Sequence, residues 1–202
     1  GYKPARNESF VDLTDTLRAL ADLVETGKIR HIGVSNETPW GIMSFLQQAS
    51  LHRLPAIVST QNPYNLLNRS LEVGLAEVLH REAVGLIAYS PLAFGRLTGK
   101  YYAGQQPPEA RITKFDRFKR YSNEIGKIAA DRYVDLANTH GLPPAQMAIA
   151  FLLQKQYVSS VLIGATNLEQ LKINIASSTV TLDKEILKAI DKIHHDNANP
   201  CP

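Results

Sequence analysis

The sequence predicts an α/β fold in which a parallel sheet is covered by helices. Segments with apolar residues at helical spacing alternate with short apolar runs along the 202 residues. These runs are too continuous for an antiparallel sheet with one face in water, which favours parallel strands. No linker or low-complexity stretch divides the chain, so we expect residues 1–202 to form one domain.

A helix, a strand and a second helix are expected first. Within residues 10–30, leucine and valine recur at helical spacing, and Gly27 suits the left-handed end of that helix. The apolar run 32–34 is typical of a buried strand. Thr38 then suits the N-cap of the next helix, and Pro39 suits its first residue.

The same alternation continues through the middle of the chain. Residues 56–58 predict a second strand that runs into Gln61 and Asn62, and residues 70–83 predict the next amphipathic helix. A third strand begins at residue 84 and ends at Tyr89. A long connection then follows before helical spacing returns.

The last third of the chain predicts four helices and a strand. Ser122 is the expected cap of one helix, and residues 143–154 form another. A fourth strand lies within 159–167. We expect Asn167 and Asp183 to cap the two helices that follow it.

The composition is that of an ordinary globular protein. The chain is 44% hydrophobic and 20% charged, and its formal net charge of +3 is spread among acidic residues, which favours a solvated surface over a nucleic-acid site. Cys201 is the single cysteine, so neither an internal disulfide nor a cysteine-based metal site is expected. With no signal pattern or membrane-length apolar run, we expect a cytoplasmic protein. The chain opens in a polar loop at Gly1 without methionine, so we expect further sequence upstream.

Every predicted strand ends in polar or turn-forming residues. They are Ser35 and Asn36, Gln61 and Asn62, Tyr89 and Ser90, and Gly164 with Thr166. Because the carboxyl ends of parallel strands meet at one edge, these groups should lie together. Any one pair is explained by capping or turn chemistry, but four strands out of four favour a binding site.

The connection after the third strand is long, glycine-bearing and basic. Its glycines are Gly95, Gly99 and Gly104, and its cations are Arg96, Lys100, Arg111, Lys114, Arg117, Lys119 and Arg120. Close approach of backbone amides at glycine, together with positive charge, suits phosphate. A solvated basic loop explains the same pattern equally well.

Four motifs carry a resemblance to a known family. They are GKIRHIGVSNET, QNPYNLLNR, AYSPLAFGRLTGKY and LIGATNLEQLKINI. In this order and separation they resemble the aldo-keto reductases, and most of all the branch with the Tas-like reductases and the potassium-channel β-subunits. The resemblance implies a (β/α)8 TIM barrel that binds NADPH at its C-terminal rim, of which this chain is similar to the second half.

The resemblance implies roles for individual residues. Ser35, Asn36 and Gln61 match positions that hydrogen-bond the nicotinamide carboxamide, and Tyr89 matches the aromatic residue that stacks on the nicotinamide ring. The loop around the pyrophosphate is matched by Ser90, Pro91, Leu92, Ala93 and Phe94, with Lys100 and Arg111 reaching phosphate. The segment that holds the 2′-phosphate and adenosine is matched by Gly164, Thr166, Gln170 and Asn174.

The catalytic residues of the family have no match in this sequence. The family uses an Asp, a Tyr, a Lys and a His, all from the first half of the barrel. The six histidines, His31, His52, His80, His140, His194 and His195, are expected at surfaces or helix ends. Tyr64, Tyr101 and Tyr102 could face the site but lack an evident lysine partner. Ile173 stands where many relatives place an acid near the adenine.

The resemblance leads to one hypothesis and two alternatives. The first is an NADPH-dependent oxidoreductase that reduces aldehydes or ketones, to which this chain contributes the cofactor-binding half and by itself is inactive. The second is a non-catalytic regulatory subunit that senses a nicotinamide nucleotide. The third is a truncated segment without a function of its own. Half a barrel leaves open sheet edges, so we expect it to need its missing half or a second copy as partner.

Overall fold

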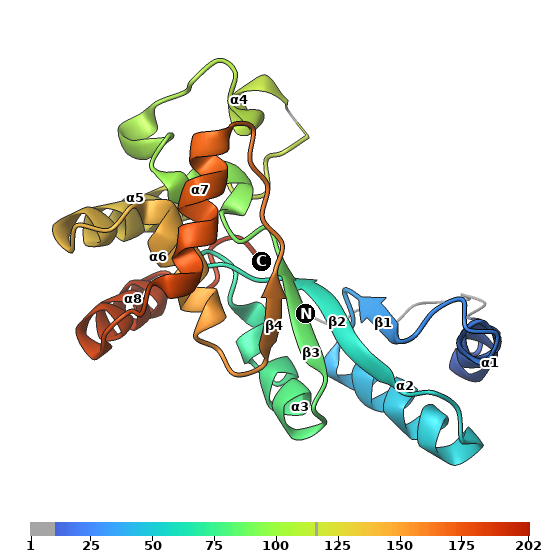
Figure 1. The fold of residues 1–202 in the computed structure, drawn as a ribbon. Coiled ribbons are helices and arrows are strands. Elements are labelled where there is room, and N and C mark those ends of the chain that lie inside the picture. Colours follow the sequence, from blue (N-terminus) through green and yellow to red (C-terminus); the bar gives the residue numbers. More distant parts are fainter. Residues whose placement is uncertain (1–10, 116) are drawn as a thin grey trace.

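The computed structural model describes residues 11–115 and 117–202. Its described residues form a sheet of four strands in the order β1-β2-β3-β4, and every neighbouring pair is parallel. The strands are β1 (Ile32–Ser35), β2 (Ile57–Pro63), β3 (Gly85–Tyr89) and β4 (Val158–Val161). Figure 1 shows the four strands side by side, with helices in each connection. The prediction of an α/β fold with parallel strands is confirmed; the opening loop predicted before residue 10 lies outside the described residues.

The helix before β1 ends, and the helix after β1 begins, at the residues that the local sequence predicts. Helix α1 (Leu13–Glu25) ends just before Gly27, which has a φ of 70° and supplies the left-handed turn. Helix α2 (Pro39–His52) is capped by Thr38, whose hydroxyl accepts a hydrogen bond from the Gly41 N–H at 3.0 Å. Both end signals are short-range, which explains why the sequence alone predicts them.

The segment after β1 differs from the prediction in two ways. Strand β2 runs to Pro63, so Gln61 and Asn62 lie inside the strand rather than beyond it. The helix predicted over 70–83 is divided into a 3-10 turn (Ser70–Glu72) and helix α3 (Leu75–Arg81). Gly74 between them has a φ of 89°, which a continuing right-handed helix cannot contain.

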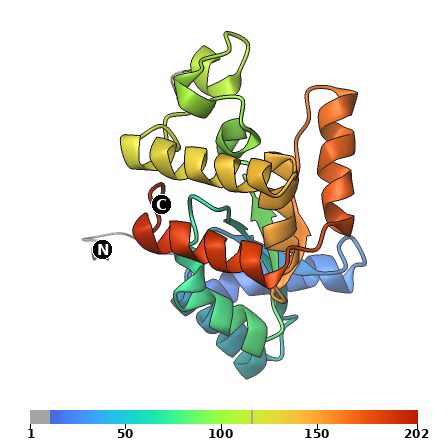
Figure 2. The same ribbon diagram turned by 90° about the vertical axis from the view of Figure 1, so that its left-hand side faces the viewer.

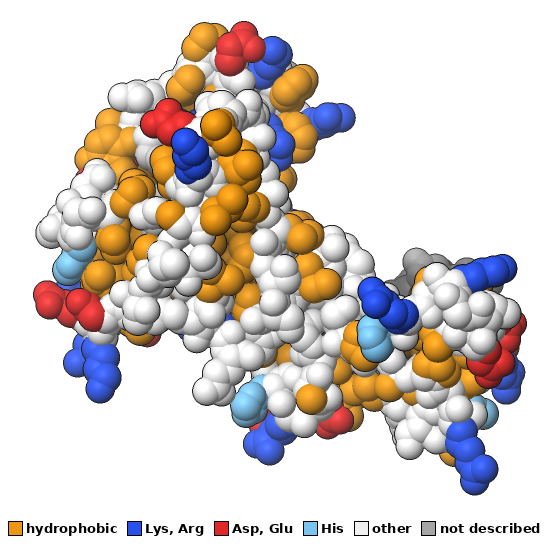
Figure 3. All heavy atoms as spheres, viewed as in Figure 1, with side chains coloured by type: hydrophobic (Ala, Val, Ile, Leu, Met, Phe, Trp, Pro, Cys, Tyr) orange, Lys and Arg blue, Asp and Glu red, His pale blue; other side chains and the backbone are white. Residues whose placement is uncertain are grey.

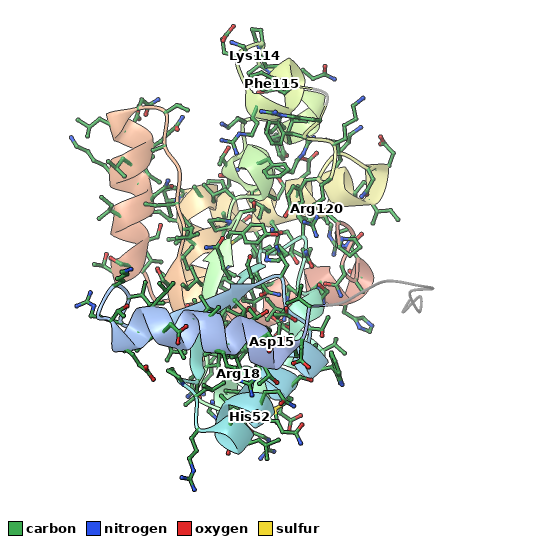
Figure 4. All side chains as sticks on the ribbon, turned by 90° about the vertical axis from the view of Figure 1, so that its right-hand side faces the viewer. Asp15, Arg18, His52, Lys114, Phe115 and Arg120 are labelled. Carbon is green, nitrogen blue, oxygen red and sulfur yellow. The ribbon has the colours of Figure 1, made fainter. Side chains whose placement is uncertain are left out.

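The described residues of the long connection after β3 form only short helical pieces. These are the 3-10 segments Ala93–Thr98 and Tyr102–Gly104 and the single turn α4 (Arg111–Lys114). Figure 4 shows Lys114 and Phe115 at the tip of this connection, Arg120 lower down, and Asp15, Arg18 and His52 at the opposite end of the molecule.

The last helices follow the prediction with one correction. They are α5 (Glu124–Thr139), α6 (Pro144–Leu153), α7 (Leu168–Ala176) and α8 (Lys184–Asp196), with a 3-10 turn (Ser177–Thr179) after α7. The predicted caps Asn167 and Asp183 are confirmed. Ser122 was the wrong cap for α5: Asn123 takes this place, and its side-chain oxygen accepts from the Gly126 N–H at 2.8 Å.

The two faces of the sheet have different coverings. On one face Thr60 pairs with Leu86, Asn62 pairs with Ala88, and all four side chains are buried. Helices α5, α6 and α8 gather on the side of β4, whereas α1 and α2 lie near β1 and β2 (Figure 1). From the second view, α5 and α8 lie side by side (Figure 2). This helix-covered face holds the core.

The opposite face carries small residues in neighbouring strands. Gly33 pairs with Ser59, and Ser59 pairs with Gly85. A Cβ atom on Gly33 would lie 2.6 Å from the Ser59 hydroxyl oxygen, so a larger residue there would require the Ser59 side chain to move. Figure 3 shows the molecule hollowed between the part around α7 and the part around α1.

An ion-pair network is centred on the buried side chain of Arg69. The Arg69 guanidinium donates two hydrogen bonds to Glu72, at 2.9 and 2.7 Å, and one to Asp191 of α8 at 2.9 Å. The Tyr64 hydroxyl donates to the same Glu72 carboxylate. Arg69 also stacks over the Phe151 ring at 4.9 Å and is 6% exposed. The network therefore joins the turn after β2 to α6 and α8.

Candidate functional site

Hydrogen bonds join the polar residues at the ends of β1, β2 and β3. Ser35 and Gln61 are register partners, and the Ser35 hydroxyl donates to the Gln61 carbonyl at 3.1 Å. The side-chain nitrogen of Asn36 donates to the Ser35 hydroxyl at 3.3 Å. The side-chain oxygen of Asn36 accepts from the Tyr89 hydroxyl at 2.9 Å. Four residues predicted for one site therefore form one cluster.

The backbone explains why Asn36 can reach Tyr89. Asn36 has a φ of 57°, a left-handed conformation that asparagine adopts more readily than most residues. Its N–H donates to the Gln61 carbonyl at 2.9 Å, which holds this conformation. Ser35 and Asn36 are exposed, whereas Gln61 and Tyr89 are half-buried. The cluster thus presents hydroxyl and amide groups beside a partly covered aromatic ring.

The loop after β3 turns sharply at residues that rarely adopt such a backbone. Ser90, Ala93 and Phe94 have φ values of 55°, 48° and 55°, and Gly95 has 93°. Pro91 and Ala93 are buried, while Ser90, Leu92 and Phe94 are half-buried. The predicted segment Ser90–Phe94 is therefore a tight turn directly beyond Tyr89.

Two of the predicted cations lie against this turn. The Lys100 amine would be 3.2 Å from a Cβ atom on Gly95, so its side chain crosses the glycine closely. The Arg111 guanidinium lies 6.0 Å from the centre of the Phe94 ring and 5.3 Å from that of Phe118. Within the described part of the chain, neither cation forms an ion pair. By contrast, Lys114 pairs with Glu109 at 2.6 Å.

The residues predicted after β4 form a second group. The Gln170 side-chain oxygen accepts from the Thr166 N–H at 3.0 Å and from its hydroxyl at 3.1 Å. Asn174 is 5% exposed and donates to the Gly164 carbonyl at 3.3 Å, so it supports the loop from beneath. The Leu162 N–H donates to the Ala88 carbonyl at 2.8 Å, which ties this segment to β3.

Of the remaining candidates, most lie away from the cluster. Tyr64 and Tyr101 are buried, and the Tyr102 hydroxyl donates to Asp135 of α5 at 2.7 Å, so these tyrosines do not face the site. His52 and His80 are exposed in last turns of helices, as predicted. His194 on α8 is half-buried, and burial lowers its pKa.

Two residues that support this region were not predicted from the sequence. Asn65 and Tyr121 are fully buried, and the Asn65 side-chain amide donates to the Tyr121 hydroxyl at 3.0 Å. Burial raises the pKa of Tyr121, so its hydroxyl keeps its proton at neutral pH. Asn65 lies in the QNPYN motif, but its partner is 56 residues away, and no local pattern indicates that contact.

A comparison with models of protein families shows to which family this chain belongs. The model described as the aldo/keto reductase family matches residues 2–195. The chain belongs to the aldo/keto reductase family. Proteins of this family are oxidoreductases that generally use nicotinamide cofactors. Four parallel strands with helices are consistent with part of the aldo/keto reductase barrel, and that this part is the second half stays a prediction.

Individual proteins also resemble this chain over most of its length. Protein tas of Escherichia coli (strain K12) is 52% identical over 202 residues, which cover 100% of this chain and 58% of that protein. A Babesia bovis aldo-keto reductase is 37% identical over 182 residues, covering 87% and 64%. L-glyceraldehyde 3-phosphate reductase of Escherichia coli O157:H7 is 33% identical over 200 residues, covering 93% and 56%. The resemblance to the Tas-like branch is confirmed.

The extent of these matches limits what they say of the whole protein. The chain spans less than two thirds of the length of these curated relatives. Two of these relatives are named as reductases. Across residues 11–115 and 117–202, no helix combines the length and apolar character needed to cross a membrane.

Proposed function

We propose that this chain supplies the cofactor-binding rim of an NADPH-dependent reductase that acts on aldehydes or ketones. The observation that carries the proposal is the hydrogen-bonded cluster of Ser35, Asn36, Gln61 and Tyr89. NADPH, when bound, supplies the hydride that reduces a carbonyl carbon.

The cluster fits the nicotinamide end of the cofactor. A carboxamide needs both donors and acceptors, which the Ser35 hydroxyl and the Asn36 and Gln61 amides provide. The Tyr89 ring is held at its hydroxyl by Asn36 at 2.9 Å, so one of its faces can support a flat heterocycle. In this proposal Tyr89 orients the nicotinamide ring, while the amides hold its substituent.

The basic turn fits the phosphates. Lys100 and Arg111 lie against the turn at Phe94 and Gly95 without an acidic partner in the described residues. Guanidinium and ammonium groups bind phosphate through charge-assisted hydrogen bonds. The α7 dipole has its positive end near Thr166 and Gln170, which suits the 2′-phosphate that distinguishes NADPH from NADH.

The proton for the carbonyl oxygen must come from another group. Of the tyrosines considered in the chain, Tyr64 and Tyr101 are buried and Tyr102 is bonded to Asp135. We therefore place the proton donor outside residues 1–202, in the part of the longer relatives that this chain does not match. This keeps the proposal that the chain alone does not catalyse the reaction.

The test is a titration of the purified protein with NADPH and NADH, followed by the fluorescence of the reduced nicotinamide. Tyr89→Phe removes only the hydrogen bond to Asn36, and it should weaken NADPH binding by about threefold to tenfold. Tyr102→Phe is the matched control, because it removes a hydrogen bond of similar length to Asp135. A protein that contains the full relative-like length and neither binds NADPH nor reduces a simple aldehyde would refute the proposal.

A further inference from the structure

Asn65 is a buried polar side chain whose hydrogen-bonding groups are all engaged. It is 0% exposed and is the second residue after the end of β2. Its amide nitrogen donates to the Ser90 carbonyl and to the Tyr121 hydroxyl, each at 3.0 Å, and its oxygen accepts from the Leu67 N–H at 2.9 Å. A residue so enclosed cannot touch a bound ligand, so any effect on binding passes through these neighbours.

The bond to Ser90 acts on the backbone beside Tyr89. The Tyr64 N–H donates to the Tyr89 carbonyl at 3.2 Å, and Asn65 donates to the next carbonyl along. Ser90 has a φ of 55°, a left-handed conformation that is unfavourable for a residue with a side chain. Such a conformation persists where neighbours hold it. Asn65 therefore stabilises the bend that follows the Tyr89 ring.

The bond to Tyr121 acts on the far end of the same turn. Tyr121 is fully buried, and its ring meets the Phe94 ring edge-on, with the centres 4.9 Å apart. Phe94 also has a left-handed backbone, with a φ of 55°. One amide group thus supports both ends of the segment Ser90–Phe94.

Asn68 offers a comparison within the same loop. It is 1% exposed, and the backbones of Asn65 and Asn68 exchange hydrogen bonds at 3.1 and 3.0 Å. The Asn68 side-chain oxygen, however, accepts only from Ser70, from its hydroxyl at 2.7 Å and its N–H at 3.3 Å. Asn68 is therefore about as buried as Asn65, but within the described residues its side chain forms no hydrogen bond to the turn after β3.

We propose that Asn65 is a positioning residue for the cofactor rim: through Ser90 and Tyr121 it holds the Tyr89 ring and the Ser90–Phe94 turn in the geometry that receives the nicotinamide and the adjoining phosphate. The inference rests on the proposed function. It predicts that Asn65 affects cofactor affinity, whereas Asn68 affects only the stability of the fold.

The experiment compares Asn65→Ser with Asn68→Ser in the purified protein. Serine at either position can still accept a hydrogen bond from the N–H two residues ahead, but at position 65 it is too short to reach Ser90 and Tyr121. For each variant we would measure the thermal midpoint, and then the NADPH dissociation constant and the emission of bound NADPH well below that midpoint.

Both serine variants should lower the midpoint, but Asn65→Ser alone should weaken NADPH binding, by roughly tenfold, and shift the emission towards that of free NADPH. Equal NADPH affinity in Asn65→Ser and wild type would overturn the inference. Equal losses of NADPH affinity in Asn65→Ser and Asn68→Ser would overturn it as well. Should Asn65→Ser not fold, Tyr121→Phe decides: about threefold weaker binding supports the inference, and unchanged binding overturns it. If the wild-type protein does not bind NADPH, the proposed function fails, and the inference about Asn65 fails with it. If the wild-type protein binds NADPH and Asn65→Ser binds it equally well, only the inference about Asn65 fails.

Discussion

Replacing Glu72 with Gln tests how much the buried ion-pair network contributes to stability. The carboxylate accepts two hydrogen bonds from Arg69 and one from Tyr64, and the side chains of Arg69 and Glu72 are 7% and 23% exposed. Removing one partner of a buried pair costs about 3 to 5 kcal/mol. Because Glu72 is partly exposed and Asp191 still pairs with Arg69 at 2.9 Å, we expect a loss near the lower end, about 3 kcal/mol.

An exposed pair of the same chemistry provides the control. Arg81 donates to Glu77 on α3 at 2.8 Å, and these side chains are 71% and 67% exposed. Glu77→Gln should change the free energy of unfolding by less than about 1 kcal/mol, because water and salt screen the pair. Urea unfolding followed by circular dichroism at pH 7 measures both variants. Equal losses in the two variants would refute the argument from burial.

The same pair predicts a dependence on pH. Burial raises the pKa of Glu72, but hydrogen bonds from Arg69 and Tyr64 outweigh this and hold the pKa below its ordinary value of 4.5. The carboxylate therefore contributes stability above pH 4.5, and this contribution is lost as the pH falls through the lowered pKa. The stability difference between wild type and Glu72→Gln should narrow on acidification; a difference that is constant from pH 7 to pH 3 would contradict this.

Two further predictions concern the turn after β3 and helix α5. Replacing both Lys100 and Arg111 with Ala should weaken NADPH binding by roughly 1 to 3 kcal/mol for each charged hydrogen bond lost. Lys114→Ala is the control and should leave the affinity unchanged. Titration with NADPH measures both variants, and unchanged affinity in the double variant would show that neither cation belongs to the site. Gly126→Ala would place a Cβ atom 2.5 Å from the Cys201 sulfur and should lower the thermal midpoint. In a Cys201→Ala background the same change should lower the midpoint less, because the contact with sulfur is removed and only the 3.3 Å approach to the Asn123 side-chain oxygen remains. Equal losses in both backgrounds would contradict the packing argument.

The parts of the fold that were predicted correctly depend on short-range signals. Thr38, Asn167 and Asp183 cap their helices through hydrogen bonds to residues three positions ahead, so each is visible in its own segment. Ser122 and Asn123 are adjacent polar residues that could each cap α5. Asn123 takes this place and also donates to the Pro200 carbonyl at 2.7 Å, a contact 77 residues away that no local pattern indicates. The division at Gly74 depends on a backbone conformation that helical periodicity does not reveal.

The candidate site was predictable where it follows the strands and unpredictable where it is supported from behind. Tyr89 and Asn36 could be expected to meet because parallel strands end at one edge. Asn65 and Tyr121 meet although they are 56 residues apart, at opposite ends of a stretch that includes β3 and most of the long connection, so no local pattern indicates their contact. Supporting contacts of this kind require the tertiary structure.

The left-handed turn after β3 has a consequence for the kinetics of ligand association. Ser90, Ala93, Phe94 and Gly95 take up their unusual backbone conformations when the chain folds, through contacts that involve no ligand. Under the proposed function, the cofactor would meet a loop that is already shaped, so its association would not wait for a slow rearrangement of the backbone. Differences in affinity among variants of this turn should therefore appear in how long the complex lasts.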